Sequence, residues 1–521
     1  MDVGSASSVL GGGRFEVRGT LGSGGAGVVY RVLDRQLGRE VALKLLRQAS
    51  GRDLYRFKRE FRALADIVHP NLVALHELHA SGGEWYLTME LVEGVSFIDW
   101  VRPGRAAGPR RSRGDIQTGA LDERRLRDAL IQLADALLAL HRAGKLHRDL
   151  KPSNVLVTRR GRLVLLDFGL ITGVAEGDPE RLAVGTPVYM SPEQASDQPL
   201  GEPSDWYAVG AMLYEAMTGR RPFEGDAEQV MTRKQSETPP HPRLLASRVP
   251  PPLAALCMAL LQPRPAARPT GTEVLERLGA APSATTRAIA RSDPPAAFVG
   301  RAGELAALRC ALADARAGGV AVLVRGAGGI GKTALVRRFL RDLGDAAQVV
   351  EGRCFEREAV PFEMLDGVVD ALTGAILTLP PGHADELAPP ELGALVRMFP
   401  VLLRVPRLAE LARQGPPPAG LAESDGRGPA ASRPEPAGLH AGGFRALRHL
   451  IARLARDRPL VLFLDDAHWG DADSAGFLTE LIHGAEPGVL VIVAHRPEDY
   501  LGVVARLRRP PGARPGDLRE L

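Results

Sequence analysis

The chain contains the run His147-Arg148-Asp149-Leu150-Lys151-Pro152-Ser153-Asn154, and Asp167-Phe168-Gly169 follows thirteen residues after Asn154. Two acidic residues and an amide in this order supply a carboxylate that can orient a nucleophile and oxygen ligands for a divalent metal ion. The run therefore predicts a site for phosphoryl transfer.

A glycine-rich stretch, Gly22-Ser23-Gly24-Gly25-Ala26-Gly27-Val28-Val29, lies upstream between two strand-like segments. Glycines let backbone N–H groups approach phosphate oxygens closely, and this stretch leads into a strand, whereas a dinucleotide-binding stretch leads into a helix. Taken alone, it is equally compatible with a plain β-hairpin turn. The next strand-like segment, Val41-Ala42-Leu43-Lys44, ends in a lysine that would sit beneath the glycine-rich turn. Glu60 on the following helix could pair with Lys44, although two such residues also suit a surface ion pair.

Together these blocks resemble the protein kinase family over residues 14–278, and in particular the bacterial eukaryotic-like (Hanks-type) serine/threonine kinases. The resemblance implies a bilobal fold in which Lys44 holds the α- and β-phosphates of ATP and Glu60 orients Lys44. It implies that Asp149 accepts the proton of the substrate hydroxyl and that Lys151 steadies the γ-phosphate.

By the same resemblance, Asn154 and Asp167 bind Mg²⁺ or Mn²⁺. Apolar side chains would sandwich the adenine, and the backbone of residues 90–92 would bind its edge. The residues that the resemblance assigns to ATP are Leu21, Gly22, Ser23, Gly24, Gly25, Ala26, Gly27, Val29, Ala42, Lys44, Glu90, Val92 and Leu156.

The segment Gly185–Glu193 resembles the substrate-docking segment of kinases, with Glu193 paired to Arg268. Lys151 and Thr186 together imply serine or threonine acceptors on protein substrates. A nucleotide-binding scaffold, which binds ATP without transferring phosphate, is the alternative from another functional class.

A second phosphate-binding motif follows the apolar run Val320–Arg325. The residues Gly326-Ala327-Gly328-Gly329-Ile330-Gly331-Lys332-Thr333 form GxxxxGKT between a strand-like run and a helical one, which is typical of a P-loop. Backbone N–H groups and the helix N-terminus would bind the phosphates. Lys332 would reach the β- and γ-oxygens, and Thr333 would ligate Mg²⁺. The phosphate-binding residues are Gly326, Gly328, Gly329, Gly331, Lys332 and Thr333.

A partner acid is expected at the end of another buried strand, and Leu460–Asp466 fits this expectation. Asp465 is the candidate metal-side acid and Asp466 the candidate base that orients water. With Phe298-Val299-Gly300-Arg301, these motifs resemble AAA-type signalling ATPases of the STAND class over residues 296–521. The sequence ends at Leu521, soon after a third strand at Val489–Ala494, so we expect a truncated module. Whether it hydrolyses ATP is left open.

Composition limits the functional classes. At about 150 residues per domain, 521 residues suggest roughly three compact units, and no apolar run approaches the ~20 residues of a membrane helix. No secretory signal is visible, and three widely spaced cysteines favour a reduced, cytoplasmic protein. A net charge of +4 argues against nucleic-acid binding, with the arginines of residues 102–113 read as a solvated loop. Only six basic residues are lysine, which suggests a specific need for the ammonium group where lysine occurs.

The predicted fold is multidomain, α+β and then α/β. Residues 1–13 form a flexible N-terminus, residues 14–278 a kinase domain (N-lobe 14–92, C-lobe 93–278), and residues 279–295 a linker. Residues 296–521 form a partial P-loop module, a parallel sheet with flanking helices and a flexible insertion near 415–443. We predict phosphorylation of serine or threonine on proteins, with ATP bound at two sites. In the alternative, a nucleotide switch, the P-loop module is the effector and the kinase domain regulates it or serves as a nucleotide-binding scaffold.

Overall fold

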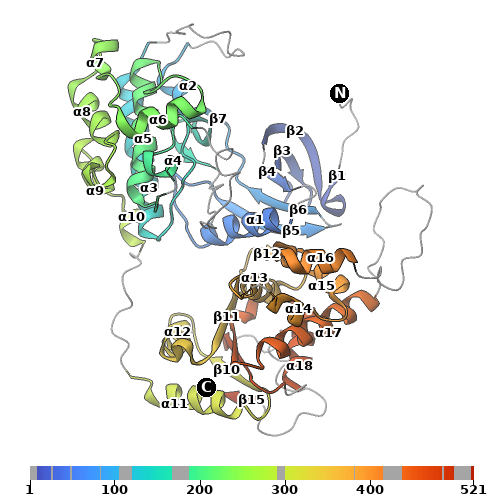
Figure 1. Ribbon diagram of the computed structural model, residues 1–521. Coiled ribbons are helices and arrows are strands. Elements are labelled where there is room, and N and C mark those ends of the chain that lie inside the picture. Colours follow the sequence, from blue (N-terminus) through green and yellow to red (C-terminus); the bar gives the residue numbers. More distant parts are fainter. Residues whose placement is uncertain are drawn as a thin grey trace.

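The computed structural model describes most of the chain. The described residues are 9–24, 27–46, 50–81, 84–104, 120–166, 187–196, 198–289, 300–380, 382–414, 437–483, 486–497 and 518–521. Figure 1 shows a strand-rich lobe and a helical lobe above a third part that contains its own sheet. Among the described residues, every helix is too short or too polar to cross a bilayer.

The first lobe is built on a sheet with the strand order β1-β2-β3-β4-β6-β5-β12. The first six strands in chain order pair with one another in antiparallel fashion. They are β1 (Val9–Leu10), β2 (Phe15–Gly24), β3 (Gly27–Asp34), β4 (Arg39–Leu46), β5 (Leu75–Ser81) and β6 (Glu84–Met89). The strand-like segments predicted around the glycine-rich stretch and at Val41–Lys44 occur as β2, β3 and β4. The seventh strand, β12 (Glu358–Ala359), comes from far along the chain and pairs in parallel with β5.

One long helix, α1 (Gly51–Leu64), packs beneath this sheet. Its first turn is fixed by a capping box, in which Ser50 Oγ accepts the N–H of Asp53 and the Asp53 carboxylate accepts the N–H of Ser50. The apolar residues at helical spacing, Leu54, Phe57, Phe61 and Leu64, are all buried in the apolar core beneath this sheet. Helix α1 is the helix that the sequence predicts after the strand of Lys44.

The second lobe is mainly helical and shares one apolar core with the first. Its long helices are α3 (Glu123–Arg142) and α5 (Glu202–Thr218), and nearly every residue of α5 is buried. Its remaining elements are α2 (Phe97–Val101), α4 (Pro192–Ala195), α6 (Ala227–Ser236), α7 (Pro242–Leu245), α8 (Pro251–Leu260), α9 (Gly271–Arg277) and a small sheet of β7 (Gly94–Ser96), β8 (Val155–Thr158) and β9 (Leu163–Leu165).

The predicted linker begins with a helix. Ser283 caps α10 (Ala284–Ala288), and the hydroxyl of its buried residue Thr286 lies 3.1 Å from His69 Nε2. The Ser283 N–H also donates to Asp135 Oδ1 of α3 at 2.9 Å, which attaches residues 283–288 to the C-lobe. Arg102, expected in a solvated loop, is buried and donates to the carbonyls of Ala216 and Met217 at the end of α5. For Arg102 that prediction was wrong because the last carbonyls of a helix need hydrogen-bond donors. The other arginines of the predicted loop, in residues 105–113, lie outside the described residues.

The third part is an α/β unit with the strand order β11-β13-β14-β10-β15, all parallel. Its strands are β10 (Val320–Arg325), β11 (Gln348–Arg353), β13 (Leu460–Asp465), β14 (Val489–His495) and β15 (Leu518–Glu520). The predicted parallel sheet is confirmed. Hereafter this part is called the P-loop module.

Helices cover both faces of this sheet, which explains why its strands are continuous apolar runs. Val322 and Val324 of β10 pack with helices α11 (Ala302–Asp314) and α12 (Lys332–Leu343). Ala321 and Leu323 point to the other face. The helices that cover that face are α13 (Glu363–Leu377), α14 (His383–Leu387), α15 (Leu392–Met398), α16 (Pro406–Gln414), α17 (Ala437–Leu454) and α18 (Ala472–His483). The predicted insertion 415–443 overlaps the first turns of α17, and residues 415–436 lie outside the described residues.

Candidate functional site

The glycine-rich stretch forms the tip of the β2–β3 hairpin, where Ser23 pairs with Val28 and Gly24 with Gly27. Gly27 has φ 125°, and a Cβ there would lie 2.3 Å from the carbonyl oxygen of Leu45. Only glycine fits this close approach, which brings the hairpin tip against β4. Gly25 and Ala26 lie outside the described residues.

Lys44 lies on β4 beneath this hairpin, pairing with Val29 on one side and Leu87 on the other. Its side chain is 4% exposed, and its Nζ lies 5.9 Å from the ring centroid of Phe57 on α1. The helix that carries Glu60 therefore contacts the lysine. The side chain of Glu60 lies outside the described part, so its pairing with Lys44 stays a prediction.

The residues predicted around adenine lie at the junction of the two lobes. Ala42 is buried and pairs with Met89, Val29 and Leu156 are half-buried, and Leu21 is exposed. The Glu90 N–H donates to the Ala74 carbonyl at 2.8 Å. Glu90 also forms a two-armed ion pair with Arg162, with distances of 2.5 and 3.0 Å. These bonds fix the segment that leads through Val92 into the C-lobe.

Two predicted catalytic residues, Asp149 and Lys151, and the predicted metal ligand Asn154 meet in the loop that ends at the 3-10 turn Pro152–Asn154. Lys151 Nζ lies 2.6 Å from Asp149 Oδ2. Asn154 Nδ2 donates to the Asp149 backbone oxygen at 2.9 Å and lies 3.2 Å from Asp149 Oδ2. The structure thus places a carboxylate, an ammonium and an amide around one point.

Asp205, at the start of α5, holds this loop in place and was not predicted. Its carboxylate accepts the backbone N–H groups of His147 and Arg148, at 2.9 and 2.8 Å, and lies 2.9 Å from His141 Nε2. Burial disfavours the charged form of Asp205, but the contacts with His141 and His147 outweigh it and lower the pKa of the carboxyl. The available signal was an acid inside an otherwise apolar helical run, because a buried charge needs partners.

Asp167 and Thr186 lie outside the described residues, and so do residues 168–185 between them. The residue before Asp167 is well anchored, since the Leu166 N–H donates to the Asn154 carbonyl at 2.7 Å and His147 Nε2 lies 3.0 Å from the Leu166 carbonyl. Leu166, the last described residue before Asp167, therefore lies directly beside the loop of residues 147–154.

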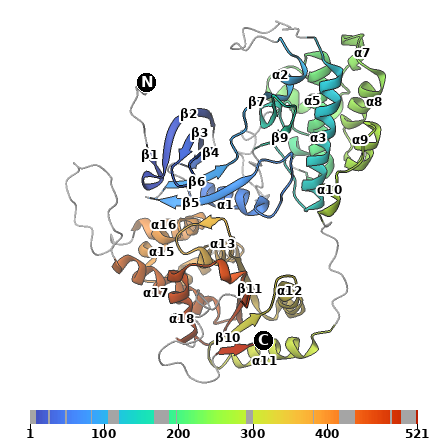
Figure 2. The same cartoon turned by 180° about the vertical axis from the view of Figure 1, so that it is seen from behind.

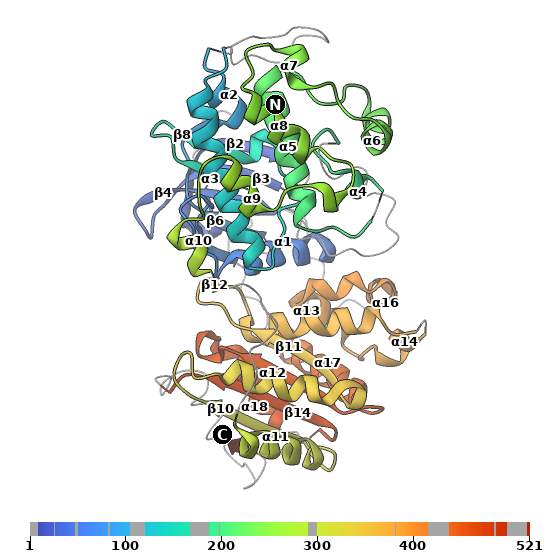
Figure 3. The ribbon, with the colours of Figure 1, turned by 90° about the vertical axis from the view of Figure 1, so that its left-hand side faces the viewer.

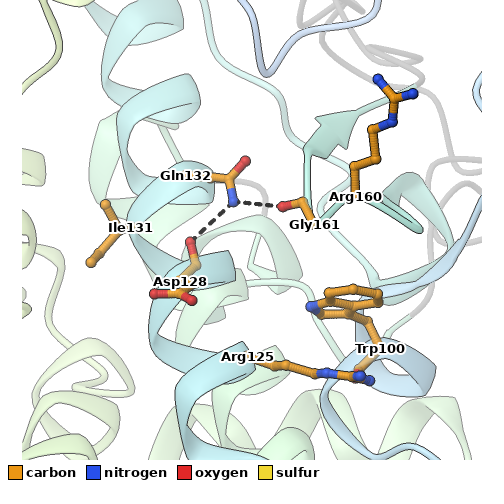
Figure 4. A pocket seen from close by; sticks show the side chains of 7 residues that line it. All are labelled: Trp100, Arg125, Asp128, Ile131, Gln132, Arg160 and Gly161. Atoms are coloured by element: carbon orange, nitrogen blue, oxygen red, sulfur yellow. Dashed lines mark hydrogen bonds between the residues drawn. The ribbon is translucent and has the colours of Figure 1, made fainter.

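Gln132 of α3 forms hydrogen bonds with the hairpin of β8 and β9, which precedes Asp167 in the chain. Its Nε2 donates to the Gly161 carbonyl at 2.9 Å, as Figure 4 shows, and its Oε1 accepts the Leu163 N–H at 2.9 Å. These bonds fix the β8–β9 hairpin that leads to Asp167. The cavity of about 340 Å³ drawn in Figure 4 lies beside Trp100 and Arg125 and contains none of the predicted catalytic residues.

The predicted pairing of Glu193 with Arg268 is confirmed. Both side chains are buried, and the two guanidinium nitrogens lie 2.6 and 2.8 Å from the carboxylate oxygens. Lys234, also buried, donates from Nζ to the carbonyls of Pro187 and Met190, at 2.5 Å each. These contacts fix residues 187–193 against the C-lobe.

In the P-loop module, the GxxxxGKT loop joins β10 to α12. Gly329 and Gly331 have φ values of 78° and 95°, in the left-handed region that favours glycine. Lys332 Nζ donates to the carbonyls of Gly326 and Ala327 within the loop, at 2.7 and 3.1 Å. Gly328 lies in the same loop.

The predicted metal-side acid is next to the P-loop threonine. Thr333 Oγ1 lies 2.9 Å from Asp465 Oδ2, although 132 residues separate the two. Burial raises the pKa of Asp465, and the adjacent Asp466 carboxylate adds to the rise. Asp466 is paired with Arg353 at the end of β11, at 3.1 Å, a partner that was not predicted.

A hydroxyl next to a carboxylate is a donor set that suits Mg²⁺, and the amide oxygen of Asn154 is a suitable ligand in the kinase domain. Asp167, the other predicted ligand there, lies outside the described residues. The residues present thus fit the metal ion that the kinase and P-loop resemblances imply at each site.

The chain belongs to the protein kinase family. The protein kinase domain matches residues 15–278, slightly more than half of the chain, and the AAA ATPase domain matches residues 297–493. Both resemblances are therefore confirmed, and both are families of ATP-binding domains.

Curated relatives are bacterial kinases. The chain is 34% identical over 266 residues to the serine/threonine-protein kinase PknA of Mycobacterium tuberculosis, which covers 49% of this chain and 58% of the relative. It is 36% identical over 278 residues to the DNA damage-responsive serine/threonine-protein kinase RqkA of Deinococcus radiodurans. The match covers 51% of this chain and 39% of the relative. It is 36% identical over 290 residues to the serine/threonine-protein kinase pkn2 of Myxococcus xanthus. The match covers 52% of this chain and 33% of the relative. The chain thus matches between one third and three fifths of the length of these relatives.

Proposed function

We propose that the protein transfers the terminal phosphate of ATP to serine or threonine hydroxyls of protein substrates. The observation that carries this proposal is the convergence of Asp149, Lys151 and Asn154 in a loop that the buried Asp205 holds. A rigidly held carboxylate beside an ammonium group suits a reaction that depends on positioning and charge stabilisation.

In this reaction the acceptor hydroxyl oxygen attacks the γ-phosphorus, and the bond from that phosphorus to the β–γ bridging oxygen breaks. Asp149 receives the hydroxyl proton, and ADP leaves. Lys151 neutralises charge on the transferred group, while Lys44 holds the α- and β-phosphates. Mg²⁺, held by Asn154 and Asp167, would screen the charge of the phosphates.

The preference for serine and threonine rests on Lys151 and Thr186 and on the kinase relatives, all of which are described as serine/threonine kinases. Glu60 would orient Lys44, and the glycine-rich residues 22–27 would cover the phosphates. A cytoplasmic location is proposed because Cys257, Cys310 and Cys354 are all free thiols. Binding to membranes or nucleic acid is not part of the proposal.

For the P-loop module we propose binding of a nucleoside triphosphate at Gly326–Thr333, with Thr333 and Asp465 on the metal side. This proposal is supported by the short contact between Thr333 and Asp465. The proposed role is regulation of the kinase domain.

The test of the kinase proposal is incubation of the purified chain with labelled ATP and Mg²⁺, followed by mapping of the phosphorylated residues. We expect label on serine or threonine in the wild type and none in Asp149→Ala. Asp128→Ala, which removes an exposed carboxylate on α3, serves as the control and should label like the wild type. Equal labelling of Asp149→Ala and wild type would remove Asp149 from its role, and an unlabelled wild type would favour the nucleotide-binding scaffold.

A further inference from the structure

Helix α1 of the kinase domain is attached to the P-loop module by a buried cluster of charges. Lys58 Nζ lies 2.8 Å from both Asp366 and Asp370 of α13. Arg62, one turn later on α1, lies 2.7 Å from Asp370 and 2.6 Å from Glu358 of β12. The two cations are four residues apart on α1, and the two aspartates are four residues apart on α13. Residues at this spacing lie on the same face of a helix, so successive turns of α1 and α13 face each other.

The cluster is protected from water, because Lys58 is fully buried and the three acids are at most 7% exposed. Charges in such a place are costly unless each has partners with good geometry. Removing one partner leaves another charge buried without compensation. The two parts of the chain are therefore held in one specific register rather than joined by an apolar, adaptable contact.

Further contacts extend along the same surface. The guanidinium of Arg404 stacks on the ring of Tyr55, 3.7 Å from its centroid. At the start of α1, a Cβ on Gly51 would lie 2.4 Å from the Pro400 carbonyl oxygen. Figures 2 and 3 both show α1 lying against the module along its length.

The kinase sheet takes part as well. The Leu78 N–H donates to the Arg357 carbonyl at 3.0 Å, and Arg357 Nη1 donates to the Leu75 carbonyl at 3.0 Å. These bonds align β12 beside β5. The module thus contacts both α1 and the strand behind it, whereas Phe57 of α1 approaches Lys44 from another side.

Arg353 connects this surface to the P-loop. Its Nε lies 3.1 Å from Asp466, and its Nη1 lies 2.5 Å from Asp66, just beyond the end of α1. Its guanidinium also lies 5.1 Å from the ring centroid of Phe355. The guanidinium of Arg62 lies 6.0 Å from the same ring centroid. One side chain therefore touches both the P-loop acid pair and the kinase helix.

Asp466 lies in the left-handed backbone region. Its φ of 53° is uncommon for a residue other than glycine, and such outliers persist where surrounding contacts impose them. Asp466 follows Asp465, the residue that accepts the Thr333 hydroxyl. Because Thr333 and Asp465 are the expected metal-side residues, a bound nucleotide and its metal ion would act directly on the immediate neighbours of Asp466.

We propose that Arg353 couples the P-loop to helix α1, so that a Mg²⁺-bound nucleoside triphosphate or diphosphate at Gly326–Thr333 changes the rate of phosphoryl transfer at Asp149. In this arrangement Arg353, Asp66 and the Lys58–Arg62 cluster are positioning residues, and the P-loop ligand is an effector. The inference rests on the proposed kinase activity and specifies its regulation.

The experiment compares the full-length wild type with Lys332→Ala, Asp66→Asn and the double variant. Two quantities are measured: the autophosphorylation rate with labelled ATP and Mg²⁺, and hydrogen–deuterium exchange of residues 51–64 with and without Mg²⁺-ADP. Asp66 is 60% exposed, so its replacement should leave the fold intact. Comparison with Lys332→Ala separates the P-loop contribution from that of the kinase cleft.

We expect Lys332→Ala to change both quantities by about 5-fold or more with Asp66 present, and by less than about 2-fold in the Asp66→Asn background. Arg353→Lys, which keeps the charge but loses the planar fork, should uncouple the sites in the same way. Asp128→Asn, which replaces a carboxylate that is 63% exposed, is the matched control and should keep the full effect.

An equal effect of Lys332→Ala in both backgrounds, or no effect in either, overturns the inference. An unlabelled wild type would instead contradict the kinase proposal. The exchange measurement on α1 would still test the coupling in that case, because it does not depend on phosphate transfer.

Discussion

The carboxylate of Asp205 accepts the backbone N–H of Arg148 at 2.8 Å, immediately before Asp149 in the chain. Arg148 has φ 65°, which is unfavourable for its side chain and must be held by its surroundings. A buried helix thus fixes the backbone from which the proposed catalytic carboxylate projects. Asp205 acts through this loop, and it is a positioning residue.

Asp205→Asn should lower kcat by about 10²-fold, because small displacements of a catalytic group are costly in rate. The KM for ATP should change little, since the adenine and phosphate contacts lie elsewhere. Steady-state kinetics on the folded variant checks this split, with circular dichroism as the test of folding. Wild-type kcat in Asp205→Asn would contradict the positioning role.

Arg268→Met should destabilise the kinase domain by about 3–5 kcal/mol, because Glu193 would be left buried without its cation. Arg233→Met is the matched control, since Arg233 pairs with Glu237 in an exposed position and should contribute only about 0–1 kcal/mol. Urea unfolding of both variants measures the difference. Similar losses in the two would argue against a special role for the buried pair.

Thr333→Ala should remove the dependence of P-loop nucleotide affinity on Mg²⁺, whereas Thr333→Ser should retain it. The reason is that the hydroxyl beside Asp465 is a proposed ligand of the metal. Titration with fluorescent ADP, in Mg²⁺ and in EDTA, checks both variants, and the signal lost in Lys332→Ala defines the P-loop component. The same Mg²⁺ dependence in Thr333→Ala and wild type would exclude this ligand.

Glu363, the first residue of α13, gives a prediction about pH. Burial, reinforced by the nearby carboxylate of Glu358, raises the pKa of Glu363 from 4.5 to about 9. Between these values the folded state keeps a proton that the unfolded state releases, so stability falls as pH rises through this range. The contribution of Glu363 is complete below pH 4.5 and is lost as pH passes 9.

Glu363→Gln cannot ionise, so its melting temperature should fall less than that of the wild type between about pH 5 and pH 9. Differential scanning calorimetry across this range checks the prediction. Glu276→Gln, which replaces an exposed carboxylate on α9, is the control and should follow the wild type. Parallel curves for Glu363→Gln and wild type would show that Glu363 titrates normally.

The sequence was sufficient for the motifs and for most elements around them. The glycine-rich hairpin, the strand of Lys44 and the run from His147 to Asn154 depend on local chemistry, which short stretches of sequence record. The P-loop and the strand ending at Asp465 were predictable for the same reason. Asp205 was not, because its role depends on contacts with residues more than fifty positions away.

The scarcity of lysine was informative beyond the phosphate-binding motifs. Lys44, Lys151 and Lys332 lie in those motifs, and two of the other lysines, Lys58 and Lys234, are almost completely buried. Each of these two donates to several oxygens from different directions. A compact ammonium can do this where a planar guanidinium cannot.

The contact between the kinase domain and the P-loop module could not be predicted. Lys58 and Asp366 are 308 residues apart, and each alone is an ordinary charged residue on a helix. β12 has two residues and no apolar alternation, so no periodic pattern marks it as a strand. Its pairing with β5 is decided by the neighbouring surface rather than by its own sequence.

That pairing has a consequence for the independence of the kinase domain. The family match ends at residue 278, yet the outer strand of the kinase sheet is supplied by residues 358–359. A fragment that stopped at the family boundary would bare the hydrogen-bonding edge of β5 and leave two cations of α1 without their acids. Bare strand edges invite pairing with other chains. The autonomous unit of this protein is therefore larger than its family boundary, and a bisected protein should be prone to self-association.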